Sequence, residues 1–152
     1  MSKQIAVVTG SSRGIGRAIA EQLARDGYWT VVNYLHNQAQ AELVVDNINS
    51  AGGKAIAIAA DVSTPEGAQK LIDETISAYG QIDVLVNNAG INRDQLILRM
   101  SDADWQEIIN TNLNSAFYCS RAALKHMVRR KYGRIINISS VVGLYGKPGQ
   151  TN

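Results

Sequence analysis

The sequence has few of the residues that would point to a metal centre, a disulfide scaffold or a membrane protein. It has one cysteine, Cys119, so an intrachain disulfide is excluded, and nothing resembles a metal cluster. No apolar run approaches membrane-spanning length, and the opening MSKQIAVV has no signal-peptide design. The net charge of +2 is too small to indicate nucleic acid by itself. We therefore expect a cytoplasmic protein with no metal, no nucleic-acid partner and no membrane contact.

What the sequence does contain is a regular alternation of strand-like and helix-like segments. Short apolar runs predict strands at residues 5–9, 30–34, 55–60, 82–87 and 134–139, the first of them buried on both faces. Helical spacing predicts helices at 15–25, at 38–50, from a capping box at 63–66 up to Gly80, and from Ser101 to about Arg130. Strands alternating with helices predict an α/β fold with a doubly wound parallel sheet, whose ligands bind beyond the carboxyl ends of the strands.

The last helical stretch is long, and one polar residue falls on its apolar stripe. An unbroken helix over residues 102–130 would span roughly 40 Å at about 1.5 Å per residue. Asn112 lies on the stripe, where a buried amide costs free energy unless it is hydrogen-bonded. We expect a break or kink near Asn112 that directs its polar groups at the active site. A satisfied core amide is the alternative.

A glycine-rich loop, TGSSRGIG (residues 9–16), follows the first strand. Gly10, Gly14 and Gly16 would let a phosphate approach the backbone, and the free N–H groups of the following helix favour an anion. The spacing excludes a P-loop, because the fifth residue after Gly10 is Ile15 rather than glycine. The alternative is a plain tight turn, but three glycines at this junction favour phosphate binding.

This loop, T-G-x-x-x-G-x-G, resembles the short-chain dehydrogenase/reductase family. The segment NNAG (residues 87–90) matches a second signature of that family, and Asn112 and Ser140 match two of its catalytic positions. The order and spacing agree along the whole chain. The resemblance implies a Rossmann-like sheet with the strand order 3-2-1-4-5.

Three further segments, residues 91–100, 110–113 and 133–143, are similar to bacterial 3-oxoacyl-[acyl-carrier-protein] reductases within that family. This similarity implies NADPH-dependent reduction of a 3-oxoacyl thioester in fatty acid biosynthesis. Two alternatives stay open. The chain could be a catalytically incomplete nucleotide-binding fragment, or a family member acting on acetoacetyl-CoA or another ketone or alcohol.

The end of the second strand indicates which nicotinamide cofactor is used. NAD enzymes usually have an acidic residue there, whereas residues 33–37 (NYLHN) contain no carboxylate to repel a 2′-phosphate. Arg13 could bind that phosphate bidentately, or be a solvated loop cation. We therefore predict NADPH, with Asp61 as an adenine-side contact or a simple turn residue. The cofactor-binding residues implied by the resemblance are Gly10, Ser12, Arg13, Gly14, Ile15, Gly16, Asn33, Asp61, Val62, Asn88, Ala89 and Gly90.

The resemblance also implies catalytic roles for Asn112 and Ser140. Asn112 would help hold a water of a proton relay, and the Ser140 hydroxyl would bind the substrate carbonyl oxygen. The family's general acid is a tyrosine in a Tyr-x-x-x-Lys pair, but no tyrosine here has a lysine four residues later. That tyrosine would come at the position directly after Asn152. We therefore expect residues 1–152 to be a single NADP-binding domain, incomplete at its C-terminus and inactive alone.

The sequence suggests one contact surface for a protein partner. The basic cluster Arg129, Arg130 and Lys131 could meet an acidic acyl carrier protein. Cations at a helix C-terminus also complement the helix dipole, which is the alternative role. The resemblance further implies a homo-oligomer, a tetramer in the complete family protein.

Overall fold

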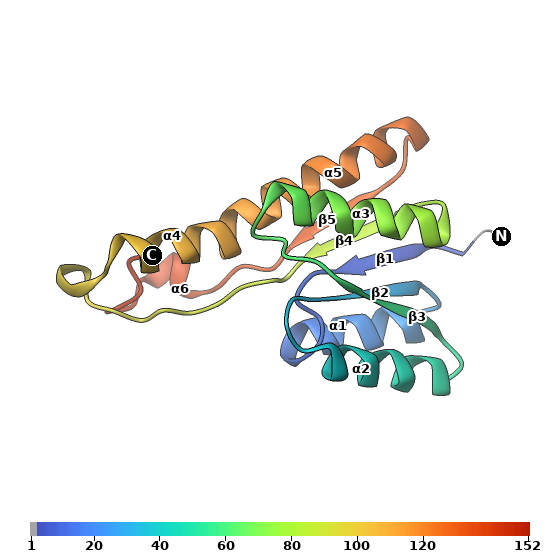
Figure 1. Cartoon of the computed structure of the whole chain (residues 1–152), viewed down its shortest axis with the longest axis horizontal. Coiled ribbons are helices and arrows are strands. Elements are labelled where there is room, and N and C mark those ends of the chain that lie inside the picture. The colour runs from blue at the N-terminus through green and yellow to red at the C-terminus, as the bar shows by residue number, and fades with distance from the viewer. Residues whose placement is uncertain (1–2) are drawn as a thin grey trace.

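The computed structural model describes residues 3–152, whose strands form one parallel sheet in the order β3-β2-β1-β4-β5 (Figure 1). The strands are β1 Ile5–Val8, β2 Trp29–Tyr34, β3 Lys54–Ala59, β4 Val84–Asn87 and β5 Arg134–Asn137. All neighbouring strands pair in parallel. The α/β class and the strand order predicted from the sequence are confirmed.

Helices cover both faces of this sheet. The helical elements are α1 Gly14–Arg25, α2 Gln38–Ser50, α3 Pro65–Tyr79, η1 Ile97–Arg99, α4 Asp102–Ile108, η2 Ile109–Asn114, α5 Ser115–Arg130 and α6 Val142–Tyr145. α1 and α2 pack on one face, and α3 and α5 on the other (Figure 1). Within residues 3–152, no helix combines the length and the apolar character needed to cross a membrane.

The central strand β1 explains why the sheet is buried on both faces. Successive residues of a strand point to opposite faces. Val7 therefore belongs to the cluster formed with α3 and α5, which includes Leu71, while Val8 belongs to the cluster formed with α1 and α2, which includes Val44. This burial is the physical basis of the continuous apolar run read as the first strand.

The start of α3 differs by one residue from the sequence prediction. The N-cap is Thr64, whose Oγ1 accepts a hydrogen bond from the Gly67 N–H at 3.1 Å. The predicted capping box beginning at Ser63 is wrong, because the Ser63 hydroxyl donates instead to Asp61 Oδ1 at 2.6 Å. Ser63 and Thr64 both have a hydroxyl that could cap the helix, and Thr64 is the one that does. Pro65 then occupies the first helical position.

The predicted irregularity near Asn112 is present as a π-helical segment. α4, η2 and α5 follow one another without a loop, but Ile109–Asn114 has i→i+5 hydrogen bonding. Such wider turns occur mostly as short insertions, often at functional sites. η2 lies with α6 and the last residues of the chain in an arm beyond the carboxyl ends of the strands (Figure 1).

Candidate functional site

The glycine loop leaves the carboxyl end of β1 and turns directly into α1. Gly10 and Gly14 have φ values of +60° and +56°, in the left-handed region that favours glycine. A Cβ at Gly10 would lie 2.9 Å from the Ala89 Cα, so the loop also needs glycine for close packing. Arg13 is the N-cap of α1, and in residues 3–152 no side chain caps this helix start. Its free N–H groups and the helix dipole fit a phosphate.

The NNAG segment after β4 is bonded to this loop. The Asn88 Nδ2 donates to the Thr9 carbonyl at 2.8 Å and to the Gly10 carbonyl at 3.2 Å. The Asn88 and Ala89 N–H groups both donate to Thr9 Oγ1 at 2.9 Å. A Cβ at Gly16 would collide with the Asn88 Nδ2. The segment therefore bonds to backbone groups of the glycine loop, while its contact with a cofactor stays a prediction.

Asn87 makes a second polar junction beneath the site. Its Nδ2 donates to the Asn137 Oδ1 at 2.8 Å and to the Ser120 Oγ at 3.1 Å. These bonds join β4 to β5 and to α5. Asn137 and Ser120 were not among the predicted site residues, although each bonds to Asn87, the first residue of the NNAG segment.

At the end of β2, the side chain of Asn33 faces the glycine loop rather than solvent. Asn33 is 2% exposed, and its Oδ1 accepts a hydrogen bond from the Gly10 N–H at 3.1 Å. Ser11, which is also buried, accepts from the Asn33 N–H through Oγ at 3.0 Å. Sequence reasoning missed Ser11, although a polar residue just after a buried strand could have been singled out, since backbone groups lose their partners there. Direct contact between Asn33 and a cofactor stays a prediction.

The remaining predicted cofactor residues differ in exposure, and Ser12 and Asp61 are half-buried. Arg13 and Ile15 are exposed on the loop, where Arg13 has no ion-pair partner among residues 3–152. Asp61 Oδ1 accepts from the Ser63 N–H and hydroxyl, so the turn role considered for Asp61 is observed. Val62 is buried in the core on the α3 side. The exposed Arg13 guanidinium is thus the free cation of this loop within the described part of the chain.

Asn112 lies on η2 and is exposed rather than part of the core. Its Oδ1 accepts from the Ile91 N–H and its Nδ2 donates to the Ile91 carbonyl, both at 2.9 Å. A Cβ at Gly90 would approach the Asn112 Oδ1 to 3.4 Å. Both polar groups of the Asn112 amide are therefore hydrogen-bonded, as the alternative prediction of a satisfied core amide required, but the amide lies at the surface and not in the core. There it holds the segment after NNAG against η2.

Ser140 and Asn112 share one cavity of about 330 Å³. Residues 92–94 and 150–152 line the same cavity. The exposed Ser140 hydroxyl accepts a hydrogen bond from the Val142 N–H at 3.2 Å, which starts the turn into α6. The structure therefore brings together the two predicted catalytic residues, which lie far apart in the sequence.

The loop 147–152 is held across this cavity by the segment that follows NNAG. The Gln95 N–H donates to the Gly149 carbonyl at 2.7 Å. The Asp94 carboxylate accepts from the Gln150 amide at 2.8 Å and pairs with Lys147 at 3.6 Å. No local pattern in the sequence indicated this pairing, because it joins two loops more than fifty residues apart.

The basic cluster at the end of α5 lies at the opposite end of the sheet from this cavity (Figure 1). Within the cluster, Arg130 is engaged with the protein itself. Its NH1 donates to Asp83 Oδ1 at 2.8 Å, and Asp83 is 1% exposed. Arg129 is exposed, and Lys131 ends the helix with φ +53°. Contact of this cluster with a carrier protein stays a prediction.

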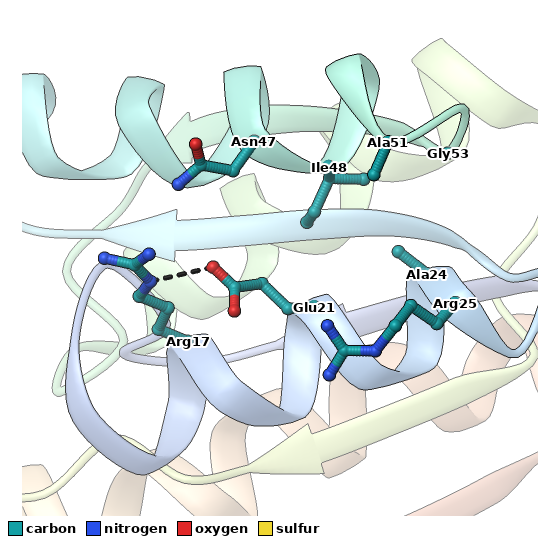
Figure 2. Close-up of a pocket in the computed structure, with 8 residues that line it drawn as sticks. All are labelled: Arg17, Glu21, Ala24, Arg25, Asn47, Ile48, Ala51 and Gly53. Atoms are coloured by element: carbon teal, nitrogen blue, oxygen red, sulfur yellow. Dashed lines mark hydrogen bonds and ion pairs between the residues drawn. The ribbon is translucent and has the colours of Figure 1, made fainter.

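Another cavity, of about 320 Å³, lies between α1 and α2 (Figure 2). Its lining includes Arg17 and Glu21, which form an ion pair at 2.8 Å. Ile48 of α2 and Ala51, the residue after α2, lie opposite. None of the predicted site residues lines it.

The thiol of Cys119 lies in the core, where burial raises its pKa to about 12. A thiol with so high a pKa is not a ready nucleophile.

Comparison with known proteins gives consistent matches over this chain. The family model described as short chain dehydrogenase matches residues 4–152. The chain is 49% identical over 147 residues to the 3-oxoacyl-[acyl-carrier-protein] reductase FabG of Staphylococcus aureus (strain N315), covering 97% of this chain and 60% of that protein. It is 49% identical over 152 residues to the 3-oxoacyl-[acyl-carrier-protein] reductase of Synechocystis sp. (strain ATCC 27184 / PCC 6803 / Kazusa), covering 100% and 62%. The chain thus spans about 60% of the length of these curated relatives.

Proposed function

The chain belongs to the short-chain dehydrogenase family, and on that basis we propose that it serves in the NADPH-dependent reduction of a 3-oxoacyl thioester. The glycine loop carries this proposal, because it joins left-handed glycines, an uncapped helix start and a free arginine within residues 3–152. The names of the relatives, 3-oxoacyl-[acyl-carrier-protein] reductases at 49% identity, support the substrate class.

Residues of three loops would hold the cofactor at the carboxyl edge of the sheet. The backbone of residues 10–16 would bind the diphosphate, and residues 88–90 would line the nicotinamide side. Arg13 would bind the 2′-phosphate, since residues 33–37 present no carboxylate that would repel it. When bound, NADPH supplies a hydride for carbonyl reduction.

Ser140 and Asn112 would act at the cavity they share. The Ser140 hydroxyl would donate a hydrogen bond to the substrate carbonyl oxygen, and Asn112 would hold the wall of the cavity and a water of the proton relay. A proton donor is also required, and the 152 residues contain no Tyr-x-x-x-Lys pair. The proposal therefore includes that these 152 residues alone have no appreciable reductase activity.

An acyl carrier protein is the proposed substrate carrier, with Arg129 and Lys131 as its contacts. These contacts lie away from the cavity. Arg129 comes seventeen positions after Asn112, which is roughly 25 Å along the helix at about 1.5 Å per residue. Binding of the carrier protein to the chain that weakens with salt, and weakens further in Arg129→Ala, would support these contacts. Carrier binding that responds to neither change would contradict them.

The cofactor proposal is tested by titrating the chain with NADPH and NADH. We expect NADPH to bind more tightly, and Arg13→Ala to weaken NADPH at least about tenfold while leaving NADH unchanged, because only NADPH has the 2′-phosphate. Arg17→Ala is the matched control, since Arg17 is on the same helix but paired with Glu21 (Figure 2). Tight NADH binding with no response to Arg13→Ala would refute the proposal.

The activity proposal needs a separate assay. We expect the 152-residue chain to bind NADPH but not to reduce acetoacetyl-CoA, because its proton donor is missing. Intact mass must confirm the chain length in the same preparation. Reduction above background by a verified chain would contradict this part, while leaving cofactor binding to be decided by the titration.

A further inference from the structure

Two asparagines hold Gly10 from opposite sides of β1. Asn33 comes from β2, and its Oδ1 accepts from the Gly10 N–H at 3.1 Å. Asn88 follows β4, and its Nδ2 donates to the Gly10 carbonyl at 3.2 Å. Both backbone groups of the first loop glycine are therefore bonded to side chains. We call Asn33 and Asn88 the Gly10 clamp.

Asn33 also joins the loop to the third strand. Its Nδ2 donates to the carbonyls of Ala60 at 3.0 Å and Ile58 at 3.3 Å. Because a backbone N–H can only donate and a carbonyl can only accept, these partners require a carboxamide with its oxygen toward Gly10.

Ser11 completes the same network. Its Oγ accepts from the Asn33 N–H at 3.0 Å and donates to the Val8 carbonyl at 2.6 Å, while its own N–H donates to the Asn33 carbonyl at 2.9 Å. Ser11 is fully buried and Asn33 is 2% exposed, so water cannot replace these partners. The loop is tied to β2 through both backbone and side-chain groups.

We infer that Asn33 is a positioning residue, which with Asn88 and Ser11 holds the glycine loop in its phosphate-binding shape before any cofactor arrives. This inference rests on the proposed function for its effect on NADPH. A loop already ordered loses less conformational entropy when the nucleotide binds, so the clamp raises affinity without touching the ligand.

The clamp also limits which side chain can occupy position 33. An aspartate there could still accept from the Gly10 N–H, but it would have no donor for the carbonyls of Ile58 and Ala60. A buried carboxylate facing two carbonyl oxygens is unfavourable. Because the side chain at position 33 is buried against these backbone groups, we expect an aspartate there to loosen the loop and to give no gain in NADH binding.

The test compares Asn33→Ala and Asn33→Asp with Asn49→Ala. Asn49 of α2 is the matched control, because its Oδ1 also accepts one backbone N–H, that of Ala55 in β3, at 2.9 Å. Two quantities are measured on folded variants: amide hydrogen exchange at Gly10 in the free protein, and the Kd values for NADPH and NADH.

We expect Asn33→Ala to speed Gly10 exchange about tenfold or more relative to Val7 in β1, and to weaken NADPH about tenfold. Asn33→Asp should weaken NADPH and give no gain in NADH, while Asn49→Ala should change neither quantity. Unchanged Gly10 exchange in Asn33→Ala, or tighter NADH binding by Asn33→Asp than by the unmodified chain, would overturn the inference.

If the Asn33 variants do not fold, Ser11→Ala gives the same test with a smaller change, since it removes only the hydroxyl bonds. We expect Gly10 exchange to rise about threefold to tenfold, and no rise would overturn the inference. Failure of the proposed function is distinguishable. In that case the unmodified chain binds neither nucleotide, while Gly10 exchange in the free protein still decides whether the clamp holds the loop.

Discussion

The neighbouring residues Arg129 and Arg130 are expected to differ sharply when each is replaced by alanine. Arg130 NH1 donates to Asp83 Oδ1 at 2.8 Å and to the Ile82 carbonyl at 3.2 Å, whereas the Arg129 side chain has no such partner within residues 3–152. Removing one partner of a fully buried ion pair costs about 3–5 kcal/mol. The Arg130 side chain is 35% exposed, so solvent screens part of the pair, and we expect roughly 1–3 kcal/mol for Arg130→Ala.

Asp83→Ala should cost more, because the carboxylate serves three donors. Besides Arg130, it accepts from the Ile5 N–H at 2.7 Å and from the Gln81 amide at 2.8 Å. The Ile5 N–H is buried at the start of β1 and would be left without an acceptor. An unsatisfied buried donor together with the lost ion pair gives an expected loss of about 3–5 kcal/mol.

Urea unfolding followed by circular dichroism measures these changes in the free energy of unfolding. Arg129→Ala is the control and should stay within about 0.5 kcal/mol of the unmodified chain. A loss for Arg130→Ala no larger than that for Arg129→Ala would refute the reasoning from burial. If the order Asp83, Arg130, Arg129 holds, only Arg129 and Lys131 can be tested for carrier docking without a change in stability.

Three other predictions concern the loop glycines, the buried thiol and the C-terminal loop. Gly14→Ala should lower the free energy of unfolding in urea by only about 1–2 kcal/mol of left-handed strain, since a Cβ there meets nothing within 4 Å. Gly16→Ala should cost more, because its Cβ would lie 2.6 Å from the Gly10 carbonyl oxygen. Equal losses for the two variants would contradict this. Burial raises the pKa of Cys119 to about 12, so the unfolded chain loses this proton first as pH rises. The free energy of unfolding should then fall by about 1.4 kcal/mol per pH unit from about pH 9 toward 12, relative to Cys119→Ala, and equal pH profiles would contradict it. Asp94→Asn should speed hydrogen exchange in residues 147–152 severalfold, whereas Glu74→Gln, which alters the similar exposed pair with Lys70, should not; equal effects would contradict a local tie.

The strands followed from the sequence because β1 is buried on both faces and each crossover contains a helix, whereas the strand order was implied by the family resemblance. The irregularity near Asn112 also followed, since an uninterrupted helix would have been too long. The hydrogen-bond partners of the Asn112 amide could not be predicted from the sequence. Its amide bonds to Ile91, twenty-one residues earlier, and that contact depends on where η2 lies beside the loop after β4.

The helix cap at Thr64 shows a different limit of sequence reasoning. Ser63 and Thr64 have the same capping chemistry, and the choice between them was set by Asp61, whose carboxylate accepts from Ser63. The contacts between residues 93–95 and 147–152 could not be predicted from the sequence either. Both segments are irregular, so no periodicity indicates which of their polar groups meet.

At the carboxyl ends of the strands, the same residues serve both the fold and the candidate site, as Asn33, Asn87 and Asn88 illustrate. Where parallel strands end, their backbone groups lose the partners that the sheet provided, and short polar side chains supply them. The same loops must stay open to a ligand, so the residues that complete the backbone bonding also fix the shape of the binding loop. Asn33 was singled out by the missing carboxylate at the end of β2, yet the partners of its amide are backbone groups of the fold itself. A loss of nucleotide binding on changing such a residue therefore identifies a ligand contact only when the exchange of Gly10 in the free protein is unchanged.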